Sequence, residues 1–219
     1  MNRESIILSV AILLLLACNA GALAQSGETK RYEVGAQFSS LSIDKGFETR
    51  TEPGFGGRFT FNLTDNIALE AQGDLFPRSE RSNAFRNGGR AVEGLFGVKI
   101  GKRFEKFGLF AKARPGFISF SQGAVDFIPT GGTNPFTAFD VRVRRLTHFA
   151  ADIGGVLEFY PTRRIFTRID AGDTIIRYGK TTINSFSLTP GGTFTPFPIT
   201  FPSDTTHNFQ FSAGVGFRF

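Results

Sequence analysis

The segment FQFSAGVGFRF, from Phe209 to Phe219, alternates strictly between apolar residues and polar or small ones. Successive side chains of a β-strand point to opposite faces of a sheet, so this alternation predicts a strand with one apolar face. Phe219, the last residue of the sequence, is aromatic and lies on that apolar face. Any fold proposed for this sequence must account for an amphipathic strand at its end.

Seven earlier segments show the same two-residue period. Leu95 is the clearest exception, because it falls among the polar positions of its segment. Together with the last segment they predict eight strands, at residues 32–38, 57–63, 67–75, 92–101, 109–117, 149–159, 166–175 and 209–219. Three predicted connections are short and polar, at residues 64–66, 105–107 and 161–164, and four are long, at about residues 45–55, 78–90, 124–146 and 184–204.

This layout predicts an all-β fold, an eight-stranded antiparallel transmembrane β-barrel. Lipid offers no hydrogen-bonding partner, so a sheet can cross a membrane only when it closes on itself and leaves no edge. An even number of strands, with short turns at one end and long loops at the other, is typical of outer-membrane barrels. A soluble barrel of the lipocalin type, apolar inside, would fit the period but neither the unequal loops nor the terminal aromatic residue.

The first 24 residues predict a secretory signal peptide. A polar start with Arg3 precedes an apolar run, and the triplet Ala22-Leu23-Ala24 fits a cleavage site. The apolar run is shorter than the roughly 20 residues of a membrane-spanning helix. Cleavage would leave one domain, residues 25–219. In an alternative reading, Leu15 to Cys18 forms a lipobox and Cys18 is lipidated; with plain cleavage the mature protein has no cysteine.

The signal peptide, the eight alternating segments and the terminal Phe219 together resemble the small outer-membrane β-barrel proteins of Gram-negative bacteria. The resemblance implies a location in the cell outer membrane, with both termini in the periplasm. It also implies that the barrel assembly machinery reads the last strand as its signal, through Phe211, Ala213, Val215, Phe217 and Phe219. Phe219 could equally belong to an interfacial aromatic girdle, and both roles are compatible.

The polar faces of the eight strands define the expected interior. An eight-stranded barrel is only wide enough for its own side chains, and unpaired buried charges are strongly destabilising. A near-balance of acids and bases therefore favours a plugged interior with an ion-pair network over a narrow charged pore. The predicted network comprises Glu33, Glu70, Asp74, Glu93, Asp152, Glu158 and Asp170 with Arg58, Lys99, Lys112, Arg114, Arg168 and Arg218.

Chemical motifs are sparse. The sequence has no cluster of cysteines and histidines for a metal, and the glycine-rich segments PTGGT and TPGGT lack the lysine of a phosphate-binding loop. His148 and His207 are both predicted near the outer rim of the barrel, without the signature of a lipid-modifying enzyme. We therefore expect no enzymatic activity, no catalytic residue, no metal and no cofactor.

The expected role is structural or adhesive, through the extracellular loops. The alternatives are a narrow porin-like channel for small or hydrophobic solutes and a lipid-modifying outer-membrane enzyme. A secreted chain rarely meets nucleic acid, so the net charge of +6 does not indicate a nucleic-acid partner. We expect a monomer that contacts membrane lipid and lipopolysaccharide. The predicted loop arginines either pair with lipid A phosphates or belong to solvated loops; they are Arg78, Arg81, Arg86, Arg90, Arg142, Arg144 and Arg145.

Overall fold

The computed structural model describes residues 30–44, 49–78, 86–130, 139–188 and 194–219. The predicted signal peptide and Cys18 lie outside these residues. No helix in the described ranges is long and apolar enough to cross a membrane. The strands are β1 (Tyr32–Asp44), β2 (Thr49–Asn62), β3 (Ile67–Phe76), β4 (Gly88–Arg103), β5 (Phe107–Pro129), β6 (Phe139–Phe159), β7 (Ile165–Tyr178), β8 (Thr181–Leu188), β9 (Phe194–Phe201) and β10 (Asp204–Arg218).

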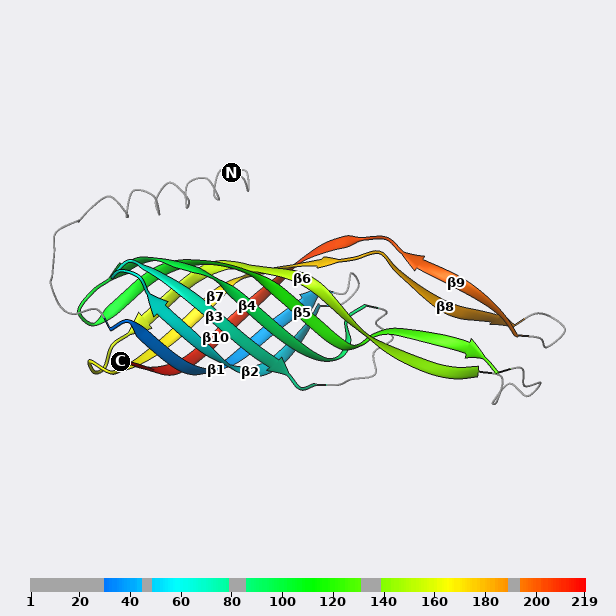
Figure 1. Cartoon of the computed structure of the whole chain (residues 1–219), viewed down its shortest axis with the longest axis horizontal. Helices are drawn as coiled ribbons and strands as arrows, with labels where there is room; N and C mark the ends of the chain where they lie inside the picture. Colours follow the sequence, from blue (N-terminus) through cyan, green and yellow to red (C-terminus); the bar gives the residue numbers. More distant parts are fainter. Residues whose placement is uncertain (1–29, 45–48, 79–85, 131–138, 189–193) are drawn as a thin grey trace.

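Eight of these strands close into a barrel in the order β1-β10-β7-β6-β5-β4-β3-β2 (Figure 1). The predicted eight-stranded antiparallel ring is therefore confirmed, and the last segment, β10, is its closing strand. β10 pairs with β1, so that Arg218 lies opposite Glu33 and Gln210 lies opposite Leu41. Beyond that ladder the backbone amide of Phe219 donates to the carbonyl of Tyr32 at 2.9 Å.

Burial alternates along the lipid-facing part of the ring as the sequence predicts, whereas Ile118 to Phe120 of β5 are buried in succession. Phe209 and Phe219 point outward and are 59% and 56% exposed, whereas Glu70 and Lys99 are buried inside. A soluble barrel would show the opposite arrangement, with its phenylalanines inside and its charges in water. The inverted reading is therefore excluded by the orientation of the side chains.

The outer surface carries an apolar band with aromatic residues at both ends. On β5 and β6, Phe107 lies opposite Phe159 at one end and Phe117 lies opposite Phe149 at the other. A strand tilted by about 40° and rising about 3.3 Å per residue covers about 25 Å between Phe107 and Phe117. This is the height of the lipid-facing band of an outer-membrane barrel, and the band ends in aromatic girdles.

The three predicted short turns are present, and two of them contain the same local hydrogen-bond arrangement. Thr64 accepts hydrogen bonds from the backbone amides of Asn66 and Ile67 through its hydroxyl. Thr162 does the same for Arg164 and Ile165. Such hydroxyl contacts replace the missing backbone partners in a tight turn.

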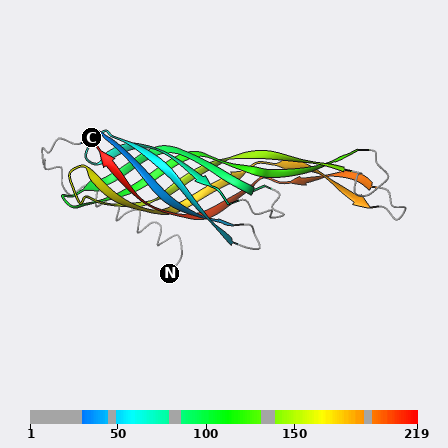
Figure 2. The same cartoon turned by 90° about the horizontal axis from the view of Figure 1, so that it is seen from below.

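At the opposite end of the barrel, two of the segments that we expected to be loops form β-strands over much of their described length. The prediction of loops was wrong there. β5 and β6 continue beyond the ring as a hairpin until Pro129 lies opposite Phe139. β8 and β9 form a second hairpin outside the ring, with Thr181 opposite Phe201. β2 also begins at Thr49, inside the first expected loop. Figures 1 and 2 show both hairpins projecting from the same end of the barrel.

The hairpin of β5 and β6 forms because its residues alternate like those of the barrel. Val125 lies opposite Val143, and Phe127 lies opposite Val141. Cross-strand pairs of β-branched and aromatic side chains stabilise an antiparallel ladder without help from lipid. The sequence pattern of residues 124–146 is therefore that of a strand pair outside the membrane.

Removal of Phe219 is expected to lower the amount of folded barrel in outer membranes. It takes away an aromatic girdle residue, the backbone pair with Tyr32 and, by the resemblance above, part of the assembly signal. Phe209→Ala is the matched control, because Phe209 is a similarly exposed, outward phenylalanine within β10. Gel mobility with and without heating would measure folded protein, and equal losses from both changes would contradict a special role of Phe219.

Candidate functional site

The barrel interior brings together all thirteen residues of the predicted network. Each is at least nine-tenths buried, although none is apolar. They come from inward positions of all eight barrel strands, β1 to β7 and β10. Most of their neighbours in space are therefore distant in sequence. The thirteen are Glu33, Arg58, Glu70, Asp74, Glu93, Lys99, Lys112, Arg114, Asp152, Glu158, Arg168, Asp170 and Arg218.

Arg168 lies at the centre of the ion pairs. Its guanidinium donates to both carboxylate oxygens of Glu70, with 2.9 Å between Nη2 and Oε2. It also donates to Asp170 at 2.7 Å and lies 3.4 Å from Glu158. Arg58 donates to the second oxygen of Asp170 at 2.9 Å. A planar guanidinium suits such bidentate contacts, which fix geometry as well as charge.

A second group of ion pairs surrounds Asp152. Arg114 donates to its carboxylate from two nitrogens, with 2.9 Å from Nε, and the Lys112 ammonium lies at 2.9 Å. On the side of the turns, the Lys99 ammonium lies 2.5 Å from Glu158. Each buried lysine therefore has a carboxylate partner within direct contact.

Arg103 belongs to the network but was missed by the sequence analysis. It donates to Glu33 at 3.0 Å and to the hydroxyl of Tyr160 at 3.1 Å. Arg103 has the same parity as Lys99 on β4, so extending that strand by two residues would have found it. With Arg103 the seven predicted acids face seven bases, and the inner charges balance.

Asp74 and Glu93 are held by neutral groups. Asp74 accepts hydrogen bonds from Gln37 at 2.8 Å and from Ser39 at 2.6 Å. Glu93 accepts one from Gln210 at 2.8 Å. The inward glutamines and serines were not singled out from the sequence, although they share the parity of the charged residues.

An apolar cluster lies above the charges, toward the projecting hairpins. Leu95, the exception to the alternation of β4, belongs to this cluster because its side chain points inward. A layer of this kind keeps water from the ion pairs beneath it. Its members are Leu41, Ile43, Phe76, Ala91, Leu95, Ile118, Phe120, Ala150, Ile176 and Tyr178.

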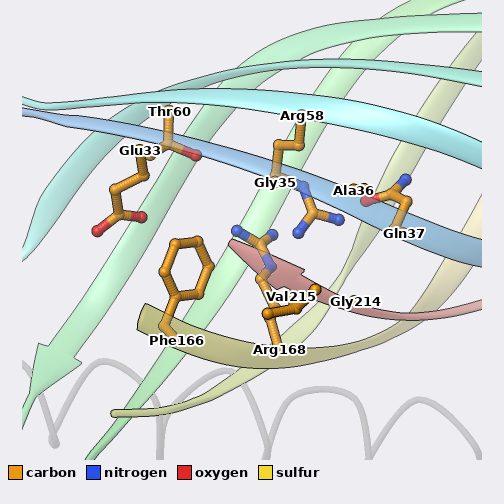
Figure 3. A pocket seen from close by; sticks show the side chains of 10 residues that line it. All are labelled: Glu33, Gly35, Ala36, Gln37, Arg58, Thr60, Phe166, Arg168, Gly214 and Val215. Atoms are coloured by element: carbon orange, nitrogen blue, oxygen red, sulfur yellow. The ribbon is translucent and has the colours of Figure 1, made fainter. Parts of the chain in front are cut away.

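The hollow that lies among these groups is small. A hollow lined by Glu33, Thr60 and Phe166 has a volume of about 10 Å³, room for roughly one water molecule. Figure 3 shows the guanidinium groups of Arg58 and Arg168 next to each other at this hollow. The interior here is filled by side chains.

The two histidines lie on opposite faces of the barrel wall. His148 points inward and is buried, with Nε2 at 3.2 Å from the carbonyl of Arg86 and its ring packed on Tyr178. His207 points outward, and its Nδ1 lies 2.6 Å from Asp173. Within the described ranges no three side chains of the metal-binding types come together.

The predicted loop arginines differ in their contacts and exposure. Arg86 donates to the carbonyl of Pro202 at 2.7 Å and so joins the entry of β4 to the second hairpin. Arg144 lies inside the hairpin contact, 2.5 Å from Asp126. Arg90 and Arg145 are exposed, and Arg81 lies outside the described residues.

The sequence matches the model of the outer membrane protein beta-barrel domain family over residues 10–219. The chain belongs to this family. It is therefore an integral protein of the cell outer membrane that crosses the bilayer with β-strands. A search of curated proteins found no match.

Solved structures of small outer-membrane barrels are similar to this chain. Neisserial surface protein A has a TM-score of 0.52 at 10% identity, covering 86% of this chain and 97% of that one. Ail, the attachment invasion locus protein of Yersinia pestis, has a TM-score of 0.43 at 16% identity, with coverage of 86% and 97%. The N-terminal barrel of Pseudomonas aeruginosa OprF has 0.44 at 13%, with 85% and 97%. At such low identity, the likeness to Neisserial surface protein A supports the fold alone.

Arg168→Met is expected to destabilise the barrel by about 3–5 kcal/mol, because it leaves Glu70 and Asp170 buried without their central cation. Urea unfolding in lipid vesicles would measure the change. It can be followed by gel mobility or by tyrosine fluorescence, because the sequence contains no tryptophan. Arg163→Met is the control, since Arg163 is exposed in a turn. Equal stability of the two variants would show that the ion pairs around Arg168 contribute little.

Proposed function

We propose that this protein is a closed barrel that anchors its two projecting hairpins at the cell surface, where they adhere to an external partner. The barrel would act as a structural support, and the hairpins would carry the contact. The observation that favours this role is the exposed apolar surface of a projection that the rest of the chain holds in place.

The projection exposes side chains that lie beyond the lipid-facing band. Val141 and Val143 on β6 are 54% and 48% exposed, and Phe197 on β9 is also exposed. Apolar side chains outside the membrane are available to a partner and gain free energy when a partner covers them. Contact through Val141 and Val143 is therefore the central element of the proposal.

The two hairpins are joined to each other, which makes the projection a defined surface. Asp126 accepts a hydrogen bond from Arg144 at 2.5 Å and one from the backbone amide of Asn184 at 3.0 Å. Arg144 also donates to the carbonyl of Thr182 at 3.0 Å. Farther out, Phe186 of β8 stacks on Phe139 at 4.3 Å between ring centroids.

A narrow channel is the first competing function. The ion pairs and the apolar cluster argue against it, because a solute would have to displace both layers. Planar-bilayer recordings of the purified protein should show no steady single-channel steps. Such steps would contradict the closed interior and favour the channel.

A lipid-modifying enzyme is the second competing function. His207 and Asp173 form a dyad at the outer rim, but the hydroxyls of Ser203 and Thr205 near it are contacted by Arg177. A nucleophile needs hydrogen-bond contact with its general base. Among the described residues, the contacts of these two hydroxyls are with Arg177 and not with His207, so the dyad gives no support to a catalytic role. We propose that the protein is not an enzyme.

Adhesion can be tested with cells that display the protein. Cells carrying the wild-type chain should bind epithelial monolayers or immobilised matrix proteins above the level of cells without it. Val141→Asp with Val143→Asp should abolish that excess, because charges replace the apolar contact. Thr195→Asp with Thr200→Asp adds the same charge to β9 and should preserve it. No excess binding by the wild type to any surface would count against the adhesive role.

The contact between the hairpins is expected to weaken in acid. Partial burial raises the pKa of Asp126, but hydrogen bonds from Arg144 and Asn184 outweigh it and hold the pKa below the ordinary value of 3.8. A depressed carboxyl pKa stabilises the folded form above the ordinary value, and this is lost as the pH falls through the lower one. Amide exchange at Asn184 should therefore accelerate below about pH 4, beyond the intrinsic pH effect.

The matched variant for this measurement is Asp126→Asn, which cannot titrate. Its Asn184 amide should exchange faster than in the wild type at neutral pH and should show no further acid-induced opening. Identical exchange in the two proteins across the pH range would contradict a role of the Asp126 carboxylate in the contact.

A further inference from the structure

Two carboxyl groups face each other at the outer end of the ion-pair network. Asp74 of β3 lies directly opposite Glu93 of β4, and both side chains point inward and are buried. Glu93 also lies opposite Ile118 of β5, one residue beyond Phe117 of the outer aromatic girdle. Like charges directly opposite each other in a sheet are destabilising, and a buried charge without compensation is strongly so. The two groups therefore need a shared compensating charge.

The hydrogen bonds of the two groups are unequal. Both oxygens of Asp74 accept hydrogen bonds, at 2.6–3.0 Å, from three neutral side chains: Gln37, Ser39 and Gln72. Glu93 accepts one at Oε2 from Gln210, at 2.8 Å, and among the described residues its buried Oε1 has no hydrogen-bond partner. Several donors stabilise a carboxylate, whereas a buried carboxyl group with few donors favours the neutral form. The geometry thus suits a charged Asp74 and a neutral Glu93.

No lysine or arginine of the described residues forms an ion pair with either group. Arg114, the cation near Glu93, donates to Asp152 and to Gln72 instead. Asp152 adds a further negative charge to the surroundings of Glu93, and its own Oδ1 lacks a donor. The other titratable groups of the surrounding strands have partners of their own: Arg58 with Asp170, Arg50 with Glu52, and His148 with the carbonyl of Arg86. A proton is therefore the compensation that the site favours.

We propose that Asp74 and Glu93 share one proton, carried at Oε1 of Glu93, and that this proton keeps the outer end of the plug closed. On β4, Glu93 lies between Ala91 and Leu95. On β3, Phe76 follows Asp74 at the next inward position. These three neighbours belong to the apolar cluster. Release of the proton to solvent at alkaline pH leaves two opposed charges beside the cluster and loosens it. This pH-sensitive latch is independent of the proposed adhesion, which uses the projection.

Infrared spectroscopy of the barrel in lipid vesicles tests the shared proton directly, because a protonated carboxyl group has a carbonyl band that a carboxylate lacks. The wild type should show this band at neutral pH and lose it at alkaline pH. Glu93→Gln should lack it at neutral pH. Glu105→Gln, in the exposed turn between β4 and β5, is the matched control and should retain it. Asp74→Asn should lose the band at a lower pH than the wild type, because the opposing charge is gone.

Urea unfolding at neutral and at alkaline pH measures what the proton does for stability. A proton that only the folded barrel holds stabilises it at neutral pH, and this contribution is lost as the pH rises until the proton is released. The unfolding equilibrium constant of the wild type and of Glu105→Gln should therefore rise, by up to about tenfold per pH unit, relative to that of Glu93→Gln. Amide exchange at Leu95 should accelerate over the same range in the wild type, beyond the intrinsic pH effect, and not in Glu93→Gln.

Absence of the carbonyl band from the wild type would overturn the proposal, as would an unchanged band in Glu93→Gln. Equal pH dependence of unfolding in the wild type and in Glu93→Gln would overturn it as well. Stability of the wild type that falls on removal of calcium or sodium ions, without such a fall in Glu93→Gln, would identify a bound metal ion and exclude the shared proton.

Discussion

Pairing of β1 with β10 is the interaction on which the rest of the structure depends. Lipid provides no partner for backbone groups, so an open sheet would leave unsatisfied amides and carbonyls along two edges. The ladder between Glu33–Arg218 and Leu41–Gln210 removes those edges. It also fixes parity, because a slip by one residue would turn every inward charge toward lipid. The separation of a polar interior from an apolar surface follows from this register.

The filled interior follows from the closed ring. Eight strands enclose a volume that side chains alone can fill, and charges taken out of water need partners. The network meets this need in two ways, with ion pairs around Arg168 and Asp152 and with neutral donors around Asp74 and Glu93. The apolar cluster then separates the charges from the end that carries the hairpins. A plug built this way is part of the folding core.

The sequence predicts the barrel well because its main signal is local. Parity along one strand tells inward from outward, so Glu70 and Phe209 are placed correctly without knowledge of their neighbours. Register between strands is not local, and it determines which groups meet. The contact of Asp173 with His207 joins residues 34 positions apart and could not be read from either segment. Arg103 was missed only because its strand was ended too early.

The hairpins were missed for a different physical reason. Inside the membrane, lipid enforces alternation, whereas outside it a strand pair is stable only through its own side chains. Glycines and prolines in residues 124–146 and 184–204 indicate loops, but the valine and phenylalanine pairs between them favour strands. Local turn signals therefore marked the tips correctly and obscured the strands that lead to them.

The edges of the projection indicate how it can make contact. Exposed strand edges invite pairing with other chains, and natural proteins protect them with prolines or charges. β9 carries Pro196 and Pro198, whose missing amides lie on the edge away from β8 because the ladder to β8 continues past them. β6 carries the exposed Asp140 and Arg142 beyond the last residue that pairs with β7. With both edges protected, addition of a strand is disfavoured, and contact through the side-chain face around Val141 and Val143 is the arrangement that the projection permits.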